Sequence, residues 1–393
     1  MTPSRHLWGL ALALSLGAAV SLGITRFAYG LLLPAMRTDL GWSYTLAGAM
    51  NTANALGYFL GALATPWLMR RVGASTLLWS GAALASVFMA LSGFFTATEP
   101  LLLQRLLAGV ASALVFIAGG LLAARLGAQD PARGGFLIGL YYGGTGLGIV
   151  LSAALVPWLL EWAQGALHGW RWAWWGLALA CALASGVLLW PARVMAQWAP
   201  PAAAGNAPAG VFRWRAFGFA LAGYTLFGVG YIGYMTFVVA LLRQQGSSAL
   251  AVTVFYGLLG VAVVASSRIW AGLLDRHRSG RALATLNALL GVATILPALT
   301  QSWPVVLASG LLFGGVFLSV VASTTALVRH NLPHSAWAAG ISAFTTVFAA
   351  GQIVGPTVVG WIADGPGGLA RGLVFSAVAL WLGALLAWRQ KAL

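Results

Sequence analysis

The sequence predicts an all-α membrane protein with about twelve transmembrane helices in two pseudo-symmetric six-helix bundles. Three observations lead to this fold class: the composition, a series of long apolar segments and an internal repeat. Hydrophobic residues make up 60% of the chain and charged residues only 7%, against about 25% charged residues in a typical soluble domain. A β-barrel would instead require short segments of alternating polarity, which the sequence does not show.

Polar and basic residues divide the chain into twelve segments, each near the roughly 20 residues that an apolar helix needs to cross a bilayer. The first six cover residues 8–35, 44–69, 75–95, 101–126, 135–160 and 172–190. The second six cover residues 216–242, 250–274, 282–299, 305–328, 336–363 and 372–388. The first segment begins like a signal peptide but is too long for a signal-peptide core, so we interpret it as a retained helix.

One long connector separates the two sets of segments, at residues 191–215. Its centre, APPAAAGNAPAG, is rich in Pro, Ala and Gly, a composition typical of a flexible linker. We therefore expect an N-terminal six-helix bundle at 1–190, a linker at 191–215 and a C-terminal six-helix bundle at 216–393.

The net charge of +15 does not indicate a nucleic-acid-binding protein, because the basic residues lie singly or in pairs between apolar segments. If the N-terminus is cytoplasmic, four basic residues fall at outer ends: Arg37, Arg171, Arg243 and Arg371. Fourteen fall at cytoplasmic ends: Arg5, Arg70, Arg71, Arg125, Arg133, Arg193, Arg213, Arg215, Arg276, Arg278, Arg281, Arg329, Arg389 and Lys391. By the positive-inside rule, both termini and the linker are cytoplasmic.

The two halves of the chain match each other at a fixed offset. A shift of 205 residues pairs Gly23 with Gly228, Tyr29 with Tyr234, Arg71 with Arg276 and Gly109 with Gly314. A shift of 207 residues pairs Gly144 and Gly148 with Gly351 and Gly355. A parallel repeat of six plus six helices places a central pathway between the halves, as in a rocking-type transporter.

Several motifs resemble those of the major facilitator superfamily over essentially the whole chain. The loop GLLDRHRSGR (272–281) is similar to the superfamily's loop signature, and RLLAG (105–109) to its Arg-x-x-x-Gly pattern. GWRWAWWG (169–176) and GQIVGP (351–356) are also typical. The segment GITRFAYGLLLPAM (23–36) resembles the YbfB/YjiJ-like bacterial branch.

The resemblance implies a transporter fold with a cytoplasmic gate formed by the loop signatures. It assigns Asp275, Arg276 and Arg71 to this gate. In the first-half loop PWLMRRVG, Arg70 stands where the signature has an aspartate. In the fifth segment, Ile149 replaces the proline of the exchanger glycine motif. Both departures argue against a standard proton-exchange mechanism.

The acidic residues and histidines lie in loops or at segment ends. The acids are Asp39, Glu99, Asp130, Glu161, Asp275 and Asp364, and the histidines are His6, His168, His277, His330 and His334. A proton carrier or a counter-ion for a cationic drug would require a carboxylate within the membrane. No metal cluster or intramembrane acid–base pair can be assembled, so we expect no cofactor, no metal and no enzymatic activity.

Two arginines within the apolar segments are the main functional candidates. Arg26 lies about 12 Å and Arg105 about 6 Å from the predicted outer surface, at ~1.5 Å per residue. Insertion of an arginine at the membrane centre costs about 2.5–3.5 kcal/mol. An anionic ligand would offset this cost. The alternatives are that the guanidinium groups reach the lipid headgroups or pair with backbone carbonyls.

Other polar and aromatic residues at similar depths are candidate ligand contacts. Asn51 and Asn54 are three residues apart, on adjacent helical positions. The remaining candidates are Tyr29, Tyr142, Tyr231, Tyr234 and Gln352. Helix packing or interhelical hydrogen bonding is the alternative role for each of them.

The sequence thus predicts a secondary active transporter that moves a small organic anion by alternating access. Its expected partners are this small-molecule substrate and the lipid bilayer, without nucleic acid, and we expect a monomer. An exporter of neutral or amphipathic compounds is the alternative within the same class. A non-transporting membrane receptor on the same fold is the alternative from another class, and a membrane acyltransferase would lack its acid–base residues.

Overall fold

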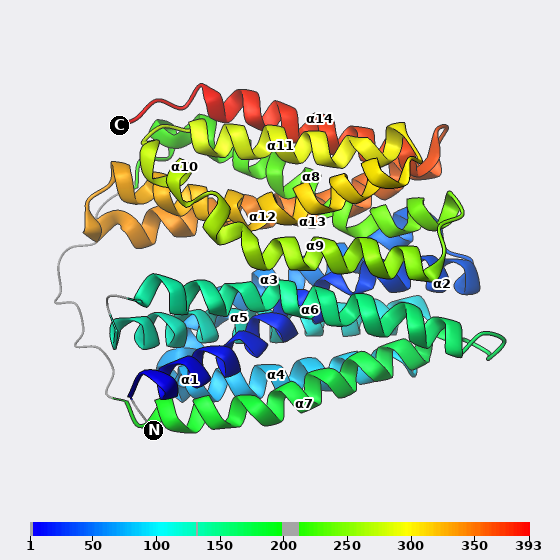
Figure 1. Ribbon diagram of the computed structural model, residues 1–393, viewed down its shortest axis with the longest axis horizontal. Helices are drawn as coiled ribbons and strands as arrows, with labels where there is room; N and C mark the ends of the chain where they lie inside the picture. Colours follow the sequence, from blue (N-terminus) through cyan, green and yellow to red (C-terminus); the bar gives the residue numbers. More distant parts are fainter. Residues whose placement is uncertain (1–2, 131–132, 199–211) are drawn as a thin grey trace. The chain divides into compact units, whose positions relative to one another are not determined.

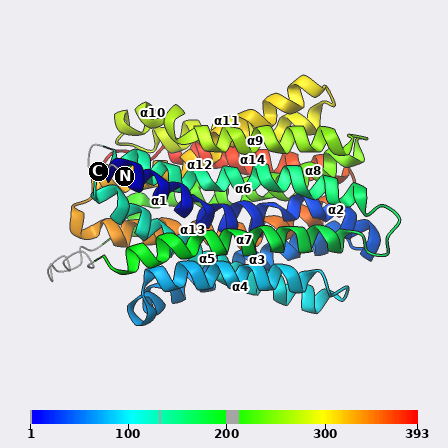
Figure 2. The same cartoon turned by 60° about the horizontal axis from the view of Figure 1, so that its bottom comes forward.

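A computed structural model describes residues 3–130, 133–198 and 212–393. The described part of the first half forms α1 (Pro3–Ala18), the π-helix η1 (Ala19–Phe27), α2 (Tyr29–Leu40), α3 (Tyr44–Val72), α4 (Ala74–Ser92), α5 (Thr98–Ala128), α6 (Gly134–Trp162) and α7 (Trp170–Ala196). In Figure 2, α1, η1 and α2 follow one another as one bent rod.

The described part of the second half begins with a short 3-10 helix, η2 (Trp214–Phe217). It continues with α8 (Gly218–Gln244), α9 (Ala249–Ile269), α10 (Ala271–Arg276), α11 (Arg281–Leu299), α12 (Trp303–Asn331), η3 (His334–Ala336), α13 (Trp337–Asp364) and α14 (Gly368–Trp388). Figure 1 labels the α-helices along the chain.

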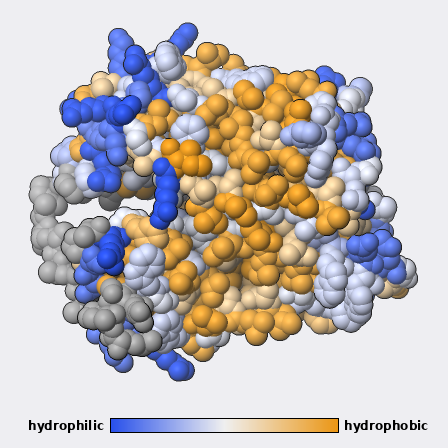
Figure 3. Space-filling model, in the orientation of Figure 1, coloured by the Kyte–Doolittle hydropathy of each residue, from blue (hydrophilic) through white to orange (hydrophobic). Residues whose placement is uncertain are grey.

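Eleven helical stretches of the described residues are long and apolar enough to cross a membrane. The twelfth predicted segment corresponds to α3, which is more polar because it carries Asn51, Thr52 and Asn54. On the face seen in Figure 3, apolar side chains cover the middle of the helices and hydrophilic side chains gather at their ends. These observations confirm the predicted fold class, an all-α multi-pass membrane protein.

The helices differ from the predicted segments at three places. The eighth segment, predicted as one helix over 250–274, is interrupted at Trp270 between α9 and α10. The indole Nε1 of Trp270 donates a hydrogen bond to the carbonyl of Gly315 (2.7 Å). The first segment contains the π-helix η1, which the apolar pattern did not predict. Helix α7 continues through Pro191 to Ala196, past the predicted segment end at residue 190, and residues 199–211 of the predicted linker lie outside the described residues.

The chain divides into two compact units. Unit 1 consists of Met1–Trp42, Ala53–Ala202 and Ser247–Val264, and unit 2 of Ser43–Thr52, Ala203–Gly246 and Ala265–Leu393. The start of α3 thus belongs to unit 2, and most of α9 belongs to unit 1. The domain division at residues 190 and 216 stays a prediction.

Both units use glycines where their first and fifth membrane helices pack together. In unit 1, a Cβ on Gly23 of η1 would lie 2.6 Å from the Cα of Gly148 in α6. In unit 2, a Cβ on Gly228 of α8 would lie 3.2 Å from the Cα of Gly351 in α13. Small residues allow membrane helices to approach this closely. Gly23 and Gly228, which are paired in the sequence, therefore both pack on a glycine of the fifth helix of their unit. At the offset of 207 residues, however, Gly351 corresponds to Gly144 rather than to Gly148.

A carboxylate at the end of α13 binds the start of α3 within unit 2. The backbone N–H of Tyr44 donates to Asp364 Oδ1 (2.7 Å), and that of Thr45 donates to Asp364 Oδ2 (2.8 Å). The hydroxyl of Thr45 donates to the same Oδ2 (2.6 Å). The first N–H groups of a helix have no intrahelical acceptor, and a negative charge is favourable there. Asp364 therefore caps α3 from 319 residues away in sequence.

Candidate functional site

The candidate site lies in unit 1, where the first membrane helix changes its hydrogen-bonding pattern. Over η1 the backbone winds as a π-helix. The hydroxyl of Thr25 donates to the carbonyl of Val20, five residues earlier (2.6 Å). Pro34 in α2 has no N–H to donate to a preceding carbonyl. Such irregular turns are frequent at functional sites because they leave backbone carbonyls without their usual helical partners.

Side chains from two other helices donate hydrogen bonds to backbone carbonyls of this irregular segment. Arg105 of α5 donates from Nη1 to the carbonyl of Thr25 (2.8 Å). The hydroxyl of Tyr256 in α9 donates to the carbonyl of Phe27 (2.9 Å). A buried carbonyl that lacks a donor destabilises a protein by about 1–3 kcal/mol. These two hydrogen bonds therefore stabilise the backbone on both sides of Arg26.

Arg105 is buried, with 2% of its surface exposed, among aromatic rings. Its guanidinium carbon lies 5.0 Å from the ring centroid of Tyr29 and 5.7 Å from that of Trp174. Asn54 of α3 donates from Nδ2 to the Arg105 carbonyl (3.1 Å). Cation–π contacts of this kind are worth about 2 kcal/mol when desolvated. The predicted candidates Arg105, Tyr29 and Asn54 thus form one contiguous cluster.

Arg26 is equally buried, with 2% exposed, but it lacks comparable contacts. Its Nε and Nη2 atoms have no hydrogen-bond partner among the described residues. The guanidinium carbon lies 5.7 Å from the ring centroid of Tyr58 in α3. None of the carboxylates in the described part of the chain forms an ion pair with Arg26. Arg26 is therefore a buried cation whose Nε and Nη2 atoms, which carry three N–H bonds between them, are available to an acceptor.

Several other buried polar atoms of unit 1 have no partner within the described ranges, and two of them adjoin the arginine cluster in sequence or packing. These two are Oε1 of Gln104, the residue before Arg105, and Oγ1 of Thr145 in α6. The Thr145 carbonyl lies 2.6 Å from the place that a Cβ on Gly23 would take, so α6 adjoins η1 at this level. Buried polar atoms without a partner are uncommon in proteins, and strain, a catalytic role or a bound water or ion can account for them.

The two asparagines of α3 have different partners, although their spacing places them on adjacent helical positions. Asn54 belongs to unit 1 and binds the Arg105 carbonyl. Asn51 belongs to unit 2, where its Nδ2 donates to the hydroxyl of Thr236 in α8 (2.8 Å). Only Asn54 therefore belongs to the arginine cluster.

The candidate Tyr142 of α6 is 39% exposed. Its ring packs against Phe116 of α5 (5.5 Å between centroids) and against Tyr141 (5.1 Å). Tyr141 is fully buried, and its hydroxyl donates to the carbonyl of Phe116 (2.8 Å). These contacts join α5 and α6 rather than connecting either tyrosine with the arginine cluster.

The candidates Tyr231, Tyr234 and Gln352 form hydrogen bonds within unit 2. Tyr231 of α8 donates from its hydroxyl to Oε1 of Gln352 in α13 (2.8 Å). The hydroxyl of Tyr234 is hydrogen-bonded to the hydroxyl of Ser309 in α12 (2.7 Å). Its ring stacks on Phe313 at 4.0 Å. At the offset of 205 residues, Tyr231 corresponds to Arg26 and Tyr234 to Tyr29.

The predicted gate residues lie at the surface. Asp275 and Arg276 are the exposed last residues of the short helix α10. Arg71 is exposed at the end of α3, with its guanidinium carbon 5.1 Å from the ring centroid of Trp67. Within the described ranges, Asp275 has no ion pair. A gating role for these residues stays a prediction.

Sequence reasoning missed three residues of the arginine cluster. Tyr58 lies one helical turn after Asn54 on α3, so the spacing could have identified it. Trp174 is one of 19 tryptophans, a residue type that is enriched at membrane interfaces, so the residue type did not single it out. Tyr256 and the Phe27 carbonyl are 229 residues apart, and no local pattern connects them.

The fold and its long apolar helices define the class, a polytopic all-α membrane protein. Residues 18–388 match the family described as "Uncharacterised MFS-type transporter YbfB", and the chain belongs to this family. The family resemblance predicted from the motifs is thereby confirmed.

Relatives and solved structures agree with this class. Two Agrobacterium vitis proteins with the name "Putative tartrate transporter" are 27% identical to this chain; the alignments span 92% of it and 85% and 88% of the relatives. The fold is similar to that of a bacterial homolog of the human lysosomal transporter Spinster (TM-score 0.72, 16% identity, 99% and 97% of the two chains). It is also similar to the nucleoside transporter NupG (TM-score 0.73, 13% identity, 97% and 100%). These are transporters rather than enzymes, as predicted.

Proposed function

We propose that this transporter moves a small organic anion across a bacterial inner membrane by alternating access, with both termini in the cytoplasm. The observation that carries the proposal is the state of Arg26. It is 2% exposed, and its Nε and Nη2 atoms have no partner among the described residues. A carboxylate presents two oxygens in the geometry that a guanidinium group binds with two parallel hydrogen bonds.

Charge balance supports an anionic ligand. Removing an unpaired charge from water costs several kcal/mol unless a counter-charge and hydrogen bonds are supplied. All six acidic residues lie in loops or near helix ends, so the helix interiors do not supply a carboxylate for Arg26. A bound anion would supply both the counter-charge and the acceptors.

In this proposal Arg26 contacts the substrate, and Arg105 acts as the second cation of the site. The bond from Arg105 Nη1 to the Thr25 carbonyl fixes the backbone immediately before Arg26. Its positive charge also raises the local potential for an anion. Tyr58, whose ring lies 5.7 Å from the Arg26 guanidinium carbon, limits the orientations that the guanidinium can take.

A hydroxydicarboxylate is the first substrate class to test. The relatives that share 27% identity over most of this chain carry tartrate in their names. Tartrate has two carboxylates and two hydroxyls. A guanidinium such as that of Arg26 complements the carboxylates, and the hydroxyls could bond to buried polar atoms such as Oε1 of Gln104, which has no described partner.

The test is binding of tartrate to the purified full-length protein, measured by isothermal titration calorimetry and by thermal shift. A charge-assisted hydrogen bond contributes about 1.5–3 kcal/mol. Arg26→Gln should therefore weaken binding about ten- to a hundredfold. Arg26→Lys should recover part of this loss, because an ammonium group lacks the planar two-point geometry.

Two controls make the result specific. Arg193→Gln removes the same charge from an exposed position near the end of α7 and should leave the affinity unchanged. Threitol has the same carbon skeleton as tartrate without the charges and should not bind. If Arg26→Gln is folded and binds tartrate or another identified anion with wild-type affinity, Arg26 is a structural residue and the anion proposal fails.

A further inference from the structure

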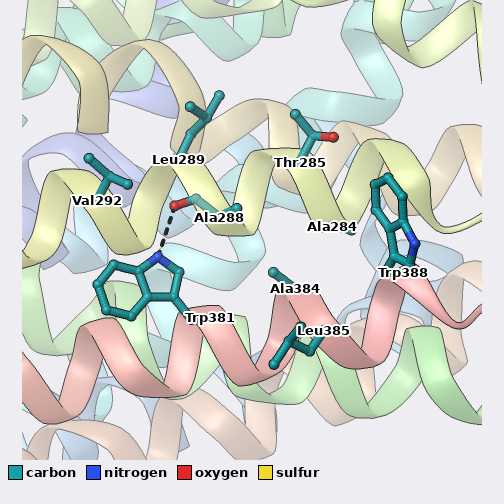
Figure 4. A pocket seen from close by; sticks show the side chains of 9 residues that line it. All are labelled: Ala284, Thr285, Ala288, Leu289, Val292, Trp381, Ala384, Leu385 and Trp388. Atoms are coloured by element: carbon teal, nitrogen blue, oxygen red, sulfur yellow. Dashed lines mark hydrogen bonds between the residues drawn. The ribbon is translucent and has the colours of Figure 1, made fainter.

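A groove in unit 2 lies between α11 and α14 (Figure 4), and none of its lining residues belongs to the arginine cluster. Its volume is about 550 Å³, within the roughly 300–1,000 Å³ typical of ligand sites. Alanine, leucine and valine side chains line it from α11, and Trp381 and Trp388 from α14. The lining is almost entirely apolar, so the groove suits a hydrocarbon chain.

One wall of the groove is held in place by the backbone of α11. The indole Nε1 of Trp381 donates to the carbonyl of Ala288 (3.2 Å), as Figure 4 shows. A Cβ on Gly291 would collide with this indole. The glycine therefore makes room for Trp381, and the hydrogen bond fixes the orientation of the ring.

The rest of the α14 wall is exposed. Trp388 is 59% exposed and Leu385 is 66% exposed. Both belong to a helix that is long and apolar enough to cross a membrane. Tryptophan is favoured where the hydrocarbon region meets the lipid headgroups, which places the Trp388 end of the groove at headgroup level.

Basic side chains gather at that same end. The guanidinium carbon of Arg281, the first residue of α11, lies 5.5 Å from the ring centroid of Trp388. The N–H of Gly280 donates to the carbonyl of Gln390 (3.0 Å), which keeps Arg389 and Lys391 beside the start of α11. Arg281, Arg389 and Lys391 are all exposed.

We propose that this groove is a binding site for an anionic glycerophospholipid. One acyl chain occupies the apolar groove beside Trp381, and the phosphate and its negative charge meet Arg281, Arg389 and Lys391. Basic residues near a bilayer attract anionic lipids, whereas a zwitterionic lipid carries no net charge for them. None of these residues belongs to the Arg26 site, so this proposal and the transport proposal can fail separately.

The experiment is native mass spectrometry of the delipidated full-length protein. It is titrated with phosphatidylglycerol or with phosphatidylcholine that has the same acyl chains. Phosphatidylglycerol should bind more tightly. Each basic residue contributes about fivefold to the affinity for anionic lipid, so Arg281→Gln should weaken binding about fivefold. The triple variant, which combines Arg281→Gln, Arg389→Gln and Lys391→Gln, should bind phosphatidylglycerol about a hundredfold more weakly.

Two more variants separate the site from general effects. Arg329→Gln is the matched control, because Arg329 is also exposed and lies 5.3 Å from the ring of Trp337, outside the groove lining; its affinity for phosphatidylglycerol should not change. Ala288→Leu fills the groove and leaves the three basic residues unchanged; it should reduce the binding of phosphatidylglycerol. Equal affinity for the two lipids, or wild-type binding by the triple variant, would overturn the proposal. The proposal would also be overturned if the wild-type protein formed a dimer that Ala288→Leu dissociates, because the groove would then bind a second copy of the chain.

Discussion

Arg105 donates a hydrogen bond of 2.8 Å from Nη1 to the carbonyl of Thr25, the residue that precedes Arg26. One buried arginine thus supports the backbone that carries the other. The π-helical geometry of η1 makes this possible, because a regular α-helix would direct that carbonyl to a backbone N–H four residues later.

The first prediction concerns this supporting bond. Arg105→Gln should weaken anion binding about three- to tenfold and lower the thermal unfolding temperature, because the buried Thr25 carbonyl loses its charged donor. Arg105→Lys should recover most of the stability, since an ammonium group can still donate to the carbonyl. Calorimetry and thermal unfolding of both variants measure these effects. Wild-type stability and affinity in Arg105→Gln would show that the contact is dispensable.

The second prediction concerns the other end of the irregular segment. Tyr256→Phe removes the donor to the Phe27 carbonyl, and it should decrease the free energy of unfolding by about 1–3 kcal/mol. Thermal unfolding in detergent measures the change. The matched control is Tyr142→Phe, because Tyr142 is 39% exposed and should tolerate the loss of its hydroxyl group. An equal effect of the two substitutions would contradict the prediction.

The third prediction concerns the cap that Asp364 places on α3. Asp364→Ala should expose the N–H groups of Tyr44 and Thr45 and destabilise the first turn of α3 by about 1 kcal/mol. Hydrogen exchange followed by mass spectrometry should then be faster in peptides that cover this turn. Glu161→Ala removes an acid from the end of α6 and serves as the control. Unchanged exchange in Asp364→Ala would mean that the cap does not stabilise the helix.

The fourth prediction concerns orientation, which the positive-inside rule places with a cytoplasmic linker. Residue 206, in the predicted linker, lies outside the described residues. A protein with Asn206→Cys and Cys181→Ser has one thiol, because Cys181 is the only native cysteine. Impermeant thiol reagents should not label it in intact cells and should label it after lysis. Labelling in intact cells would reverse the predicted orientation.

The helices were the most predictable part of the structure. Their ends lie close to the predicted bounds, as for 101–126 against Thr98–Ala128, because apolar segments end where polar and basic residues begin. The exceptions are local. Neither the π-turn of η1 nor the interruption at Trp270 changes the hydrophobic pattern, so hydropathy could not reveal them.

The candidate site was predictable only in part. The burial of Arg26 within an apolar helix follows from the sequence, and so does the lack of a nearby acid. Its relation to Arg105 depends on a carbonyl 80 residues away, and the cap on α3 depends on a carboxylate that follows 319 residues later. Such contacts are set by tertiary packing, and spacing along one helix does not encode them. Tertiary packing likewise decides that Asn51 and Asn54, although close on one helix, bind different partners.

The uncompensated charge of Arg26 has an electrical consequence. If a bound anion neutralises this cation, the empty protein is the more positively charged form. A membrane potential then acts most strongly on the return of the empty form, by up to about 2.3 kcal/mol per charge for each 100 mV. Exchange of labelled for unlabelled substrate, which avoids the empty form, should depend little on voltage. Net uptake should depend clearly on the membrane potential, because the potential then controls the rate at which the empty transporter returns.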